Sequence, residues 1–451
     1  MGGFSRSRRA LLSTSTAVLA VVALAGCAGT GGPNSPSTVG SSGSVMQGGE
    51  VPLAAPVELK GDGKRVAPAS AAVASEALTG FGLDLLGALE PDENAVISPY
   101  SVYAVLAMAR VGAKGETAAQ LDQLLGADPD VQGAVVTAVD AAVKAAIAAG
   151  AMIPTSPDAP PNRPLEFGNG NSIWVQPGLP VEQDFLDGVR QGFDSAVYEL
   201  DFEGDPEASR LTINDWVADR TRDLIPELIP EGAITVDTLM ALVNAVYLSA
   251  PWMEPLEETG DLSFTTPTGA VTVEGMRTPL TVSGAAGKGW RSATVPYLGA
   301  GLGMTLIVPD DGIAGFREQL PEVLPVATRA GGGGIPVDLT FPAFDAASKL
   351  SLVEHVRSLG YDHIFTPDTA DWTGIADITP PLEAYELVHQ AVITVDKDGT
   401  EAAAATAMLM MASSAPPPPE TLVIDRPFFF VVHDTTTGAP LFLGQITDPT
   451  A

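Results

Sequence analysis

The chain has 451 residues, and its 55 acidic side chains outnumber the 23 basic ones, which gives a net charge of -32. Such a charge repels nucleic acid and anionic lipid surfaces, so the composition argues against a DNA- or RNA-binding protein. Hydrophobic residues make up 45% of the chain, which indicates a large folded core rather than an acidic disordered chain.

The N-terminus has the pattern of an export signal. A basic stretch at 6–9 precedes an apolar run at 17–26 that is too short to span a bilayer, and Cys27 follows it. Residues 24–27 resemble the bacterial lipobox, in which the cysteine is diacylated and becomes the new N-terminus. We therefore expect export and anchoring to the outer face of the cell membrane through Cys27. Residues 7–12 also resemble a twin-arginine signal, and the general secretory route is the alternative.

The single cysteine also limits how the fold can be stabilised. With Cys27 alone there is no internal disulfide, so the folded part must be stable by packing in an oxidising compartment. A buried, inert thiol is the alternative interpretation of this residue. Residues 28–66 are rich in Gly, Ser, Thr and Pro, which predicts a flexible tether. We expect one monomeric folded domain over residues 67–451, because no break in composition divides it.

The predicted elements favour an α+β fold. Helical spacing and start signals predict helices at 70–89, 99–110, 131–149, 181–192 and 212–225. Apolar and alternating runs predict strands at 172–175, 196–202, 239–248, 270–274, 292–296, 304–308, 337–341, 387–395, 428–432 and 441–446. The nearly unbroken apolar run at 239–248 is typical of a strand buried on both faces. Early helices and late strands, without strict alternation, are typical of an α+β fold.

The residues that carry catalysis or bind metals do not occur in the patterns those functions require. The four histidines, His355, His363, His389 and His433, have no zinc-ligand spacing. The sequence contains neither a Gly-x-Ser-x-Gly motif nor a phosphate-binding glycine loop. We therefore expect a protein that is not an enzyme and that binds no metal or cofactor.

A run of small residues after the predicted strand 387–395 is the most unusual segment. It consists of Gly399, Thr400, Glu401, Ala402, Ala403, Ala404, Ala405, Thr406 and Ala407. Alanine-rich segments are usually helical. This one is short, begins at a glycine and leads to the prolines 416–419, which favour an extended conformation held away from the body. Side chains this small would let either face enter a packed sheet.

Residues 398–406 are similar to the hinge of inhibitory serpins, in which glycine, threonine and alanines permit insertion into a β-sheet. The rest of the chain resembles the same family, in family order. The matching segments are 94–101, 112–117, 214–217 with Thr221, 242–248 with Trp252, 296–297, 341–344, 370–371, 389–391 and 427–444. The resemblance implies the serpin fold, in which helices surround three β-sheets and a reactive-centre loop, here about 396–425, is exposed.

The resemblance also implies a function, the suicide inhibition of a serine protease. The protease attacks the loop and becomes acylated, and the freed hinge then inserts as a new strand of the main sheet. Insertion requires period-two alternation. If Thr400 faces inward, then so do Ala402, Ala404, Thr406, Met408 and Met410. A non-inhibitory serpin that acts as a binding or chaperone-like module is the alternative.

The family pattern also places the bond that the protease cuts. Counting from the hinge glycine puts the reactive bond at Ser413-Ser414, with Met411 and Ala412 as alternatives. Residues 398–425 contain no basic side chain, which disfavours a trypsin-like target. Small and apolar loop residues suit elastase-, chymotrypsin- or subtilisin-like proteases.

Two further sets of residues take their roles from the resemblance. Ser98, Asn244 and His389 look like the shutter, a buried polar group that holds the centre strands of the main sheet. Ordinary buried polar residues satisfied by the backbone are the alternative. Trp252 looks like the tryptophan of the breach, the end of the sheet where insertion begins.

The base of the hinge departs from the family pattern. Serpins usually carry an acidic residue two positions before the hinge glycine, where this chain has Lys397. The flanking Asp396 and Asp398 would supply the charge instead, so the resting position of the loop is less firmly predicted.

Overall fold

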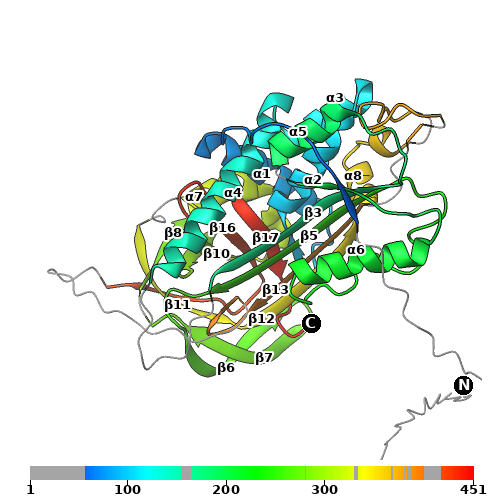
Figure 1. Cartoon of the computed structure of the whole chain (residues 1–451). Helices are drawn as coiled ribbons and strands as arrows, with labels where there is room; N and C mark the ends of the chain where they lie inside the picture. The colour runs from blue at the N-terminus through cyan, green and yellow to red at the C-terminus, as the bar shows by residue number, and fades with distance from the viewer. Residues whose placement is uncertain are drawn as a thin grey trace, which may run out of the picture. The chain divides into compact units, whose positions relative to one another are not determined.

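Every element described below belongs to the compact unit Leu53–Ala451 of the computed structural model. The residues that the structure describes are 56–153, 164–193, 195–279, 281–329, 334–366, 369–379, 381–382, 387–400 and 418–451. Figure 1 shows that most helices belong to the first half of this part of the chain and most strands to the second.

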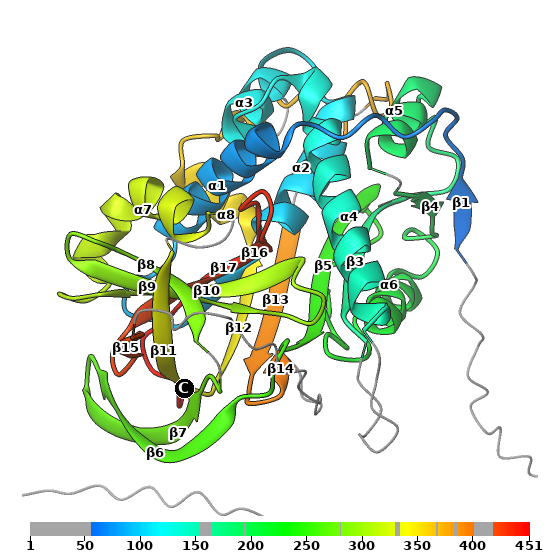
Figure 2. The same cartoon turned by 90° about the vertical axis from the view of Figure 1, so that its left-hand side faces the viewer.

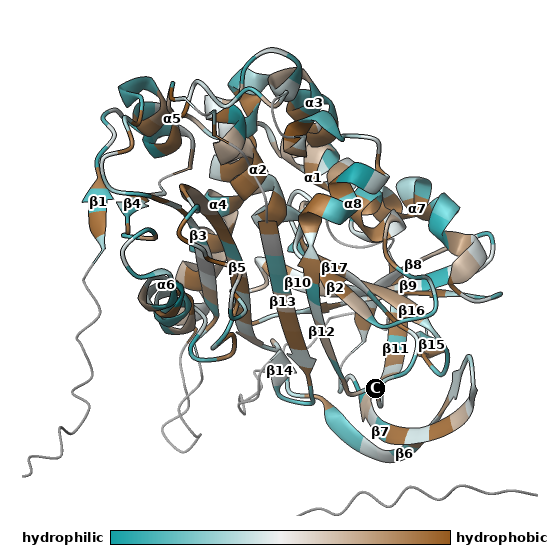
Figure 3. Ribbon diagram, turned by 90° about the vertical axis from the view of Figure 1, so that its right-hand side faces the viewer, coloured by the Kyte–Doolittle hydropathy of each residue, from teal (hydrophilic) through white to brown (hydrophobic). Residues whose placement is uncertain are grey.

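Seven strands form the main sheet, in the order β1, β4, β3, β5, β14, β13, β12. In that order they span Val57–Leu59, Val197–Glu199, Glu166–Val175, Met240–Pro251, Gly399–Thr400, Leu387–Val395 and Phe344–Ser351. The long strands β3, β5, β13 and β12 run side by side (Figure 3). β3 is antiparallel to β5, whereas β13 is parallel to β5, so a junction between unlike strand pairs lies at the centre of the sheet.

The other strands form one continuous sheet, in the order β2, β17, β16, β10, β9, β8, β11, β7, β6, with β15 paired to β11. In that order they span Ala95–Ile97, Pro440–Ile446, Phe428–Asp434, Leu302–Pro309, Trp290–Pro296, Val282–Gly287, Ile335–Pro342, Gly269–Arg277 and Glu257–Thr266, with β15 at Glu420–Val423. β11 pairs with β8 through one half and with β7 through the other, so the expected second and third sheets are joined. The predicted α+β class is confirmed.

Helices pack against both sheets. They are α1 Ala71–Gly87, α2 Pro99–Gly112, α3 Gly115–Leu125, α4 Pro129–Ala151, α5 Gln183–Phe193, α6 Pro206–Arg220, α7 Leu320–Ala327 and α8 Leu352–Ser358, with 3-10 turns at Ala314–Gln319 and His363–Phe365. Helices α1 to α5 gather together, and α6 lies apart from them (Figure 2). Helix α2 contacts β3 and β5, and α6 contacts β3 from the opposite face, where a second apolar cluster lies.

Strand β5 shows this two-sided burial directly. Val243 and Ala245 pack with the apolar residues of α6, whereas Val246, Leu248 and Ala250 belong to the core on the α2 side. Successive side chains of a strand point to opposite faces, so both faces of β5 require apolar residues. The prediction that 239–248 forms a strand buried on both faces is confirmed.

Helix starts follow their capping residues. Ser98 accepts a hydrogen bond from the Ser101 backbone and Pro99 takes the first helical position, as predicted for α2. Asp205 caps α6 in the same way, so this helix begins earlier than the predicted 212. It also ends at Arg220, before the predicted 225, since Arg222 and Asp223 have left-handed backbones with φ of 51° and 61°.

The segment that leads into the folded unit differs from a free tether. Residues 57–66 were assigned to the tether because of their polar composition, yet β1 within them pairs with β4. Further along, Val66 donates its backbone N–H to the carbonyl of Gln191. The backbone of this segment therefore gains its order from distant partners, which its own composition does not reveal.

Candidate functional site

The candidate site is the seam between β5 and β13, the two parallel strands at the centre of the main sheet. At one end of the seam the strands pair directly, from Leu242 with Leu387 to Val246 with Ala391. At the other end β14 lies between them, so that Thr400 pairs with Ala250 of β5 and with Val395 of β13. The start of the predicted hinge thus already occupies a strand position in the sheet.

The two described hinge residues are packed tightly in that position. Thr400 is buried, and its hydroxyl lies 2.6 Å from the hydroxyl of Tyr297. Thr400 therefore faces the core, which is the condition from which the inward set of hinge residues was counted. A Cβ on Gly399 would lie 2.5 Å from the carbonyl oxygen of Ala250, so only glycine fits at this close approach.

Trp252 anchors the hinge at the breach end. Its indole Nε1 donates to the carbonyl of Asp396 (2.8 Å), and its backbone N–H donates to the carbonyl of Asp398 (3.1 Å). The indole also stacks on Tyr297 with ring centroids 4.6 Å apart and planes 4° from parallel. Burial raises the pKa of the Tyr297 phenol, which remains a neutral hydrogen-bonding group. Trp252 and Tyr297 together hold both ends of the turn that feeds β14.

The carboxylate of Asp396 shapes that turn. Its Oδ1 accepts the backbone N–H groups of Asp398 (2.8 Å) and Gly399 (3.1 Å). Burial raises the pKa of Asp396, an effect that these two hydrogen bonds oppose. Lys397 points to acidic neighbours, with Nζ 3.1 Å from Asp398 and 3.9 Å from Glu258. The lysine therefore sits in an acidic surrounding, and Asp396 orders the hinge base.

The shutter residues meet at the opposite end of the seam. The backbone N–H of Ser98 donates to His389 Nε2 (3.2 Å), and His389 Nδ1 lies 2.6 Å from Asn244 Oδ1. Burial lowers the pKa of His389 to about 3, so the ring is neutral. Because Nε2 accepts, the proton is on Nδ1, which donates to Asn244. The Ser98 hydroxyl continues the chain to the carbonyl of Leu441 (2.7 Å).

Two more side chains complete this network and were missed in the sequence. Asn244 Nδ2 lies 2.7 Å from the hydroxyl of Ser101 and 2.7 Å from Oδ1 of Asn171. All of these side chains are buried. The network joins α2, β3, β5 and β13, so it connects the two sides of the seam through side chains. Asn171 lies just before the predicted strand 172–175, although β3 begins at Glu166, so no local pattern marked its role.

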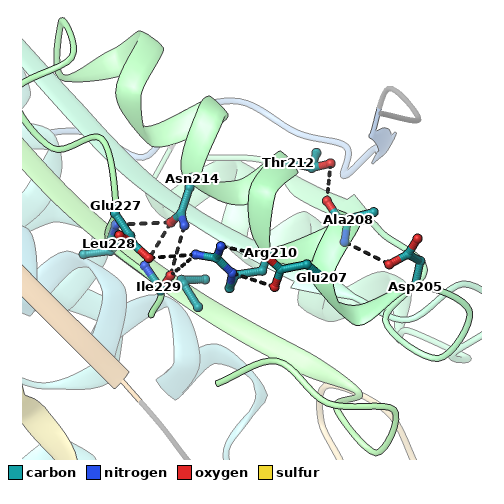
Figure 4. A network of polar contacts seen from close by, with 9 residues as sticks. All are labelled: Asp205, Glu207, Ala208, Arg210, Thr212, Asn214, Glu227, Leu228 and Ile229. Atoms are coloured by element: carbon teal, nitrogen blue, oxygen red, sulfur yellow. Dashed lines mark hydrogen bonds and ion pairs between the residues drawn. The ribbon is translucent and has the colours of Figure 1, made fainter. Parts of the chain in front are cut away.

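A loop between α6 and β5 crosses the seam on the other face, and Figure 4 shows how α6 holds it. Asn214 accepts the backbone N–H groups of Leu228 (3.1 Å) and Ile229 (2.9 Å). Arg210 donates to the carbonyl of Ile229 (2.9 Å), to Glu227 (3.0 Å) and to both carboxylate oxygens of Glu207 on its own helix.

The far side of the same loop is tied to the edge strand of the sheet. Lys349 of β12 donates from Nζ to the backbone carbonyl of Glu227 (3.3 Å). The apolar residues Leu228 and Ile229 pack over Ala245 of β5, in the cluster against which Val392 of β13 also packs. We name residues 225–229 the strap, because this segment covers both strands of the seam.

Other predicted site residues lie outside the part of the chain that the structure describes. These are the lipidation residue Cys27, the hinge residues Glu401, Ala402, Ala403, Ala404, Ala405 and Thr406, and the reactive-bond candidates Met411, Ala412, Ser413 and Ser414. Within the described ranges, no group of His, Cys, Asp and Glu side chains has the geometry of a metal site.

Comparison with known proteins gives a consistent family. A family model described as Serpin (serine protease inhibitor) matches residues 76–449. Iripin-2 of Ixodes ricinus is 31% identical over 378 residues, which cover 81% of this chain and 91% of that protein. Leukocyte elastase inhibitor of Equus caballus is 28% identical over 401 residues, covering 83% and 99%.

A solved structure supports the same conclusion at the level of the fold. The thermophilic serpin tengpin in its native state is similar with a TM-score of 0.70 and 22% identity, covering 86% of this chain and 97% of that one. The chain belongs to the serpin family, whose members generally inhibit serine proteases rather than catalyse reactions.

Proposed function

We propose that this serpin is a suicide inhibitor of an extracellular serine protease and acts by inserting its cleaved loop into the seam. The observation that carries this proposal is the position of β14, which has started a new strand between β5 and β13. A loop meant to be only a binding surface would have no need of an opened sheet. This position supports insertion of the rest of the loop along the same seam.

The register of β14 supports insertion along the whole seam. β14 is antiparallel to β5, with Thr400 opposite Ala250, and antiparallel to β13, with Thr400 opposite Val395. Continuing this register along both strands brings Thr406 opposite Asn244 and His389. Those two residues are partners across the seam in the resting sheet, so the two registers agree.

In the same register, the segment from Thr400 to Met410 is as long as the part of β5 that it would pair with. Met410 would lie opposite Met240, the first residue of β5. The side chains that share the inward face with Thr400 are Ala402, Ala404, Thr406, Met408 and Met410, and none of them is charged. Burying each methionine contributes about 1.5–3 kcal/mol, so insertion is strongly favoured once the loop is cut.

Insertion at the shutter requires one polar contact to replace another. A strand added between β5 and β13 separates them by about 4.8 Å more, which breaks the hydrogen bond between His389 and Asn244. The hydroxyl of Thr406 would arrive between these two side chains and can both donate and accept. The network would therefore be re-formed around the new strand.

The chemistry of inhibition follows from the timing of that movement. The hydroxyl of the protease serine attacks the scissile carbonyl, and the loop segment after the cut leaves as a free amine. The segment before the cut stays bound to the serine as an ester. If the hinge inserts before water attacks the ester, the protease is pulled from the loop position and its oxyanion hole is distorted. If water attacks first, the inhibitor is released as a cleaved substrate.

The bait residues and the anchor belong to the same proposal. We place the reactive bond at Ser413-Ser414, with Met411 and Ala412 as alternatives, and infer an elastase-, chymotrypsin- or subtilisin-like target. The absence of basic residues over 398–425 supports this choice. Lipidated Cys27 would hold a monomeric inhibitor at the outer face of the cell membrane, where secreted proteases act.

The proposal is tested by incubation with subtilisin and with an elastase. We expect a protease-serpin band that resists denaturation, with cleavage between Met410 and Ala415 by mass spectrometry. Cleaved protein without the protease should unfold at a higher temperature than the resting form. Clean cleavage with no stable complex and no gain in thermal stability would instead indicate a non-inhibitory serpin.

A further inference from the structure

We infer that a pocket beside the breach binds a small amphipathic carboxylate. The cavity has a volume of about 390 Å³ and lies between β8, β9, the segment that follows β5 and the end of β16. Pockets that hold small organic molecules have volumes of roughly 300–1,000 Å³ and are mostly apolar. No residue of the seam strands, the hinge or the strap lines it, so it is separate from the protease-inhibition site.

The inner wall of this pocket suits an apolar body. Met253, Leu256, Val282 and Val295 contribute hydrophobic side chains, and Leu256 and Val295 are buried. These residues come from three different strands or segments, so the wall is part of the folded core and exists without a ligand.

The polar groups deep in the pocket are already satisfied within the protein. The hydroxyl of Thr294 lies 2.8 Å from that of Thr305, and His433 Nε2 lies 2.7 Å from the same Thr305 hydroxyl. Burial lowers the pKa of His433 to about 4, so this ring is uncharged at neutral pH. Because no charged group stands at the inner wall, a ligand must place its apolar part there.

Arg329 provides a charge at the mouth of the pocket. It follows the end of α7 and is exposed, and among the described residues no carboxylate forms an ion pair with it. Glu254 also lines the pocket but already has an interaction of its own. A guanidinium without a partner beside an apolar wall matches a molecule with one carboxylate, since such a pair forms charge-assisted hydrogen bonds.

The pocket shares backbone with the anchors of the hinge. Leu256 donates its N–H to the carbonyl of Lys397 (2.7 Å), and Met253 donates to the carbonyl of Pro296 (2.9 Å). Met253 directly follows Trp252 in the chain, and Leu256 lies four residues after it. Pro296 directly precedes Tyr297. A bound molecule would therefore contact the scaffold of the breach and not the hinge itself.

Calorimetric titration of the uncleaved full chain tests this inference without any protease. The probes are 4-butylbenzoate and its neutral analogue 4-butylbenzyl alcohol. We expect one saturable site, with the acid bound roughly tenfold more tightly than the alcohol. Arg329→Met should remove this preference and leave the alcohol unchanged. Lys288→Met, which removes an exposed charge outside the pocket, is the matched control and should keep the preference.

A second variant tests the location. Val282→Trp would fill the cavity and should abolish binding of both probes, while circular dichroism reports whether the fold is retained. If acid and alcohol bind equally, if Arg329→Met keeps the preference, or if folded Val282→Trp still binds the acid, the assignment is overturned. Failure to bind at millimolar concentrations overturns it as well. None of these outcomes depends on protease inhibition.

Discussion

The two ends of the seam are held by different kinds of contact. At the breach end the strands have separated around β14, and aromatic stacking with backbone hydrogen bonds holds the hinge through Trp252 and Tyr297. At the shutter end the strands still pair, and side-chain hydrogen bonds between Asn244 and His389 connect them. The difference indicates where insertion starts and where it must overcome a closed network. An inserted residue has to match the polarity of that network.

The largest effect is expected where the loop meets the shutter. Thr406→Arg would bring a charge to a buried position whose partners are neutral, which costs several kcal/mol. We expect the variant to be cleaved normally but to lose stable complex with protease by more than roughly a hundredfold, since each 1.4 kcal/mol changes a ratio tenfold. Electrophoresis of the reaction products measures the ratio of complex to cleaved serpin.

Glu401→Arg is the matched control for that variant. Residue 401 has the opposite parity to Thr400 and would point away from the core, so the same new charge should leave the ratio nearly unchanged. A stable complex in normal yield from Thr406→Arg would break the proposed register.

The resting sheet should be more sensitive at the shutter than at the breach. Asn244→Ala leaves the proton of His389 Nδ1 and the hydroxyl of Ser101 without their partner, at about 1–3 kcal/mol for each buried group. Trp252→Phe removes one hydrogen bond but keeps an aromatic stack, at about 1 kcal/mol. Thermal unfolding of the uncleaved variants compares the two, and a larger loss for Trp252→Phe would reverse the comparison.

Acid should weaken the resting form through its two buried histidines. Burial lowers the pKa of His389 to about 3 and that of His433 to about 4, below the ordinary value of about 6.5. Below pH 6.5 the unfolded chain therefore binds protons that the folded chain cannot accept, and stability falls as pH falls toward these values. We expect a loss of about 1 kcal/mol per histidine between pH 7.5 and 5.5.

Melting temperatures at several pH values measure this loss. An unchanged melting temperature from pH 7.5 to 5.5 would show that the shutter histidine is not held neutral in the resting form.

The smallest effect is expected at the strap. Lys349 on β12 and Arg210 on α6 donate hydrogen bonds to the strap from opposite sides of the seam. Because an added strand moves β12 away from β5, one of these hydrogen bonds must lengthen or break. Lys349→Met removes the longer of these hydrogen bonds, the one to Glu227. We expect insertion to become roughly two- to threefold faster, because an exposed polar contact contributes little free energy. Stopped-flow fluorescence of a labelled loop measures the rate, with Lys288→Met as control. A slower rate would show that the strap assists insertion.

The sequence predicted much of the seam because apolar strands have a clear pattern. β13 was predicted at 387–395 and is observed at Leu387–Val395, since its mostly apolar residues are bounded by acidic ones. The shutter trio and Trp252 were found through family resemblance, and the structure shows the hydrogen bonds that they make. By contrast, α3, α7 and α8 were not predicted. Their helices are short and derive stability from packing.

Features that depend on contacts between distant segments could not be predicted. Ser101 and Asn171 are of types found on any surface, and only the fold brings them to Asn244. The same holds for β1, which is ordered by pairing with β4. It also holds for the strap, because the hydrogen bond from Lys349 to Glu227 joins residues 122 positions apart. The entry of β14 into the sheet likewise depends on register between strands, which no local pattern encodes.

The most direct measurement of the central claim is a crystal structure of the protein after cleavage of its loop. We expect the segment from Gly399 to about Met410 to lie between β5 and β13 as a full strand, with Thr406 opposite Asn244 and His389. A cleaved protein in which Leu242 still pairs with Leu387, as in the resting sheet, would contradict insertion into this seam.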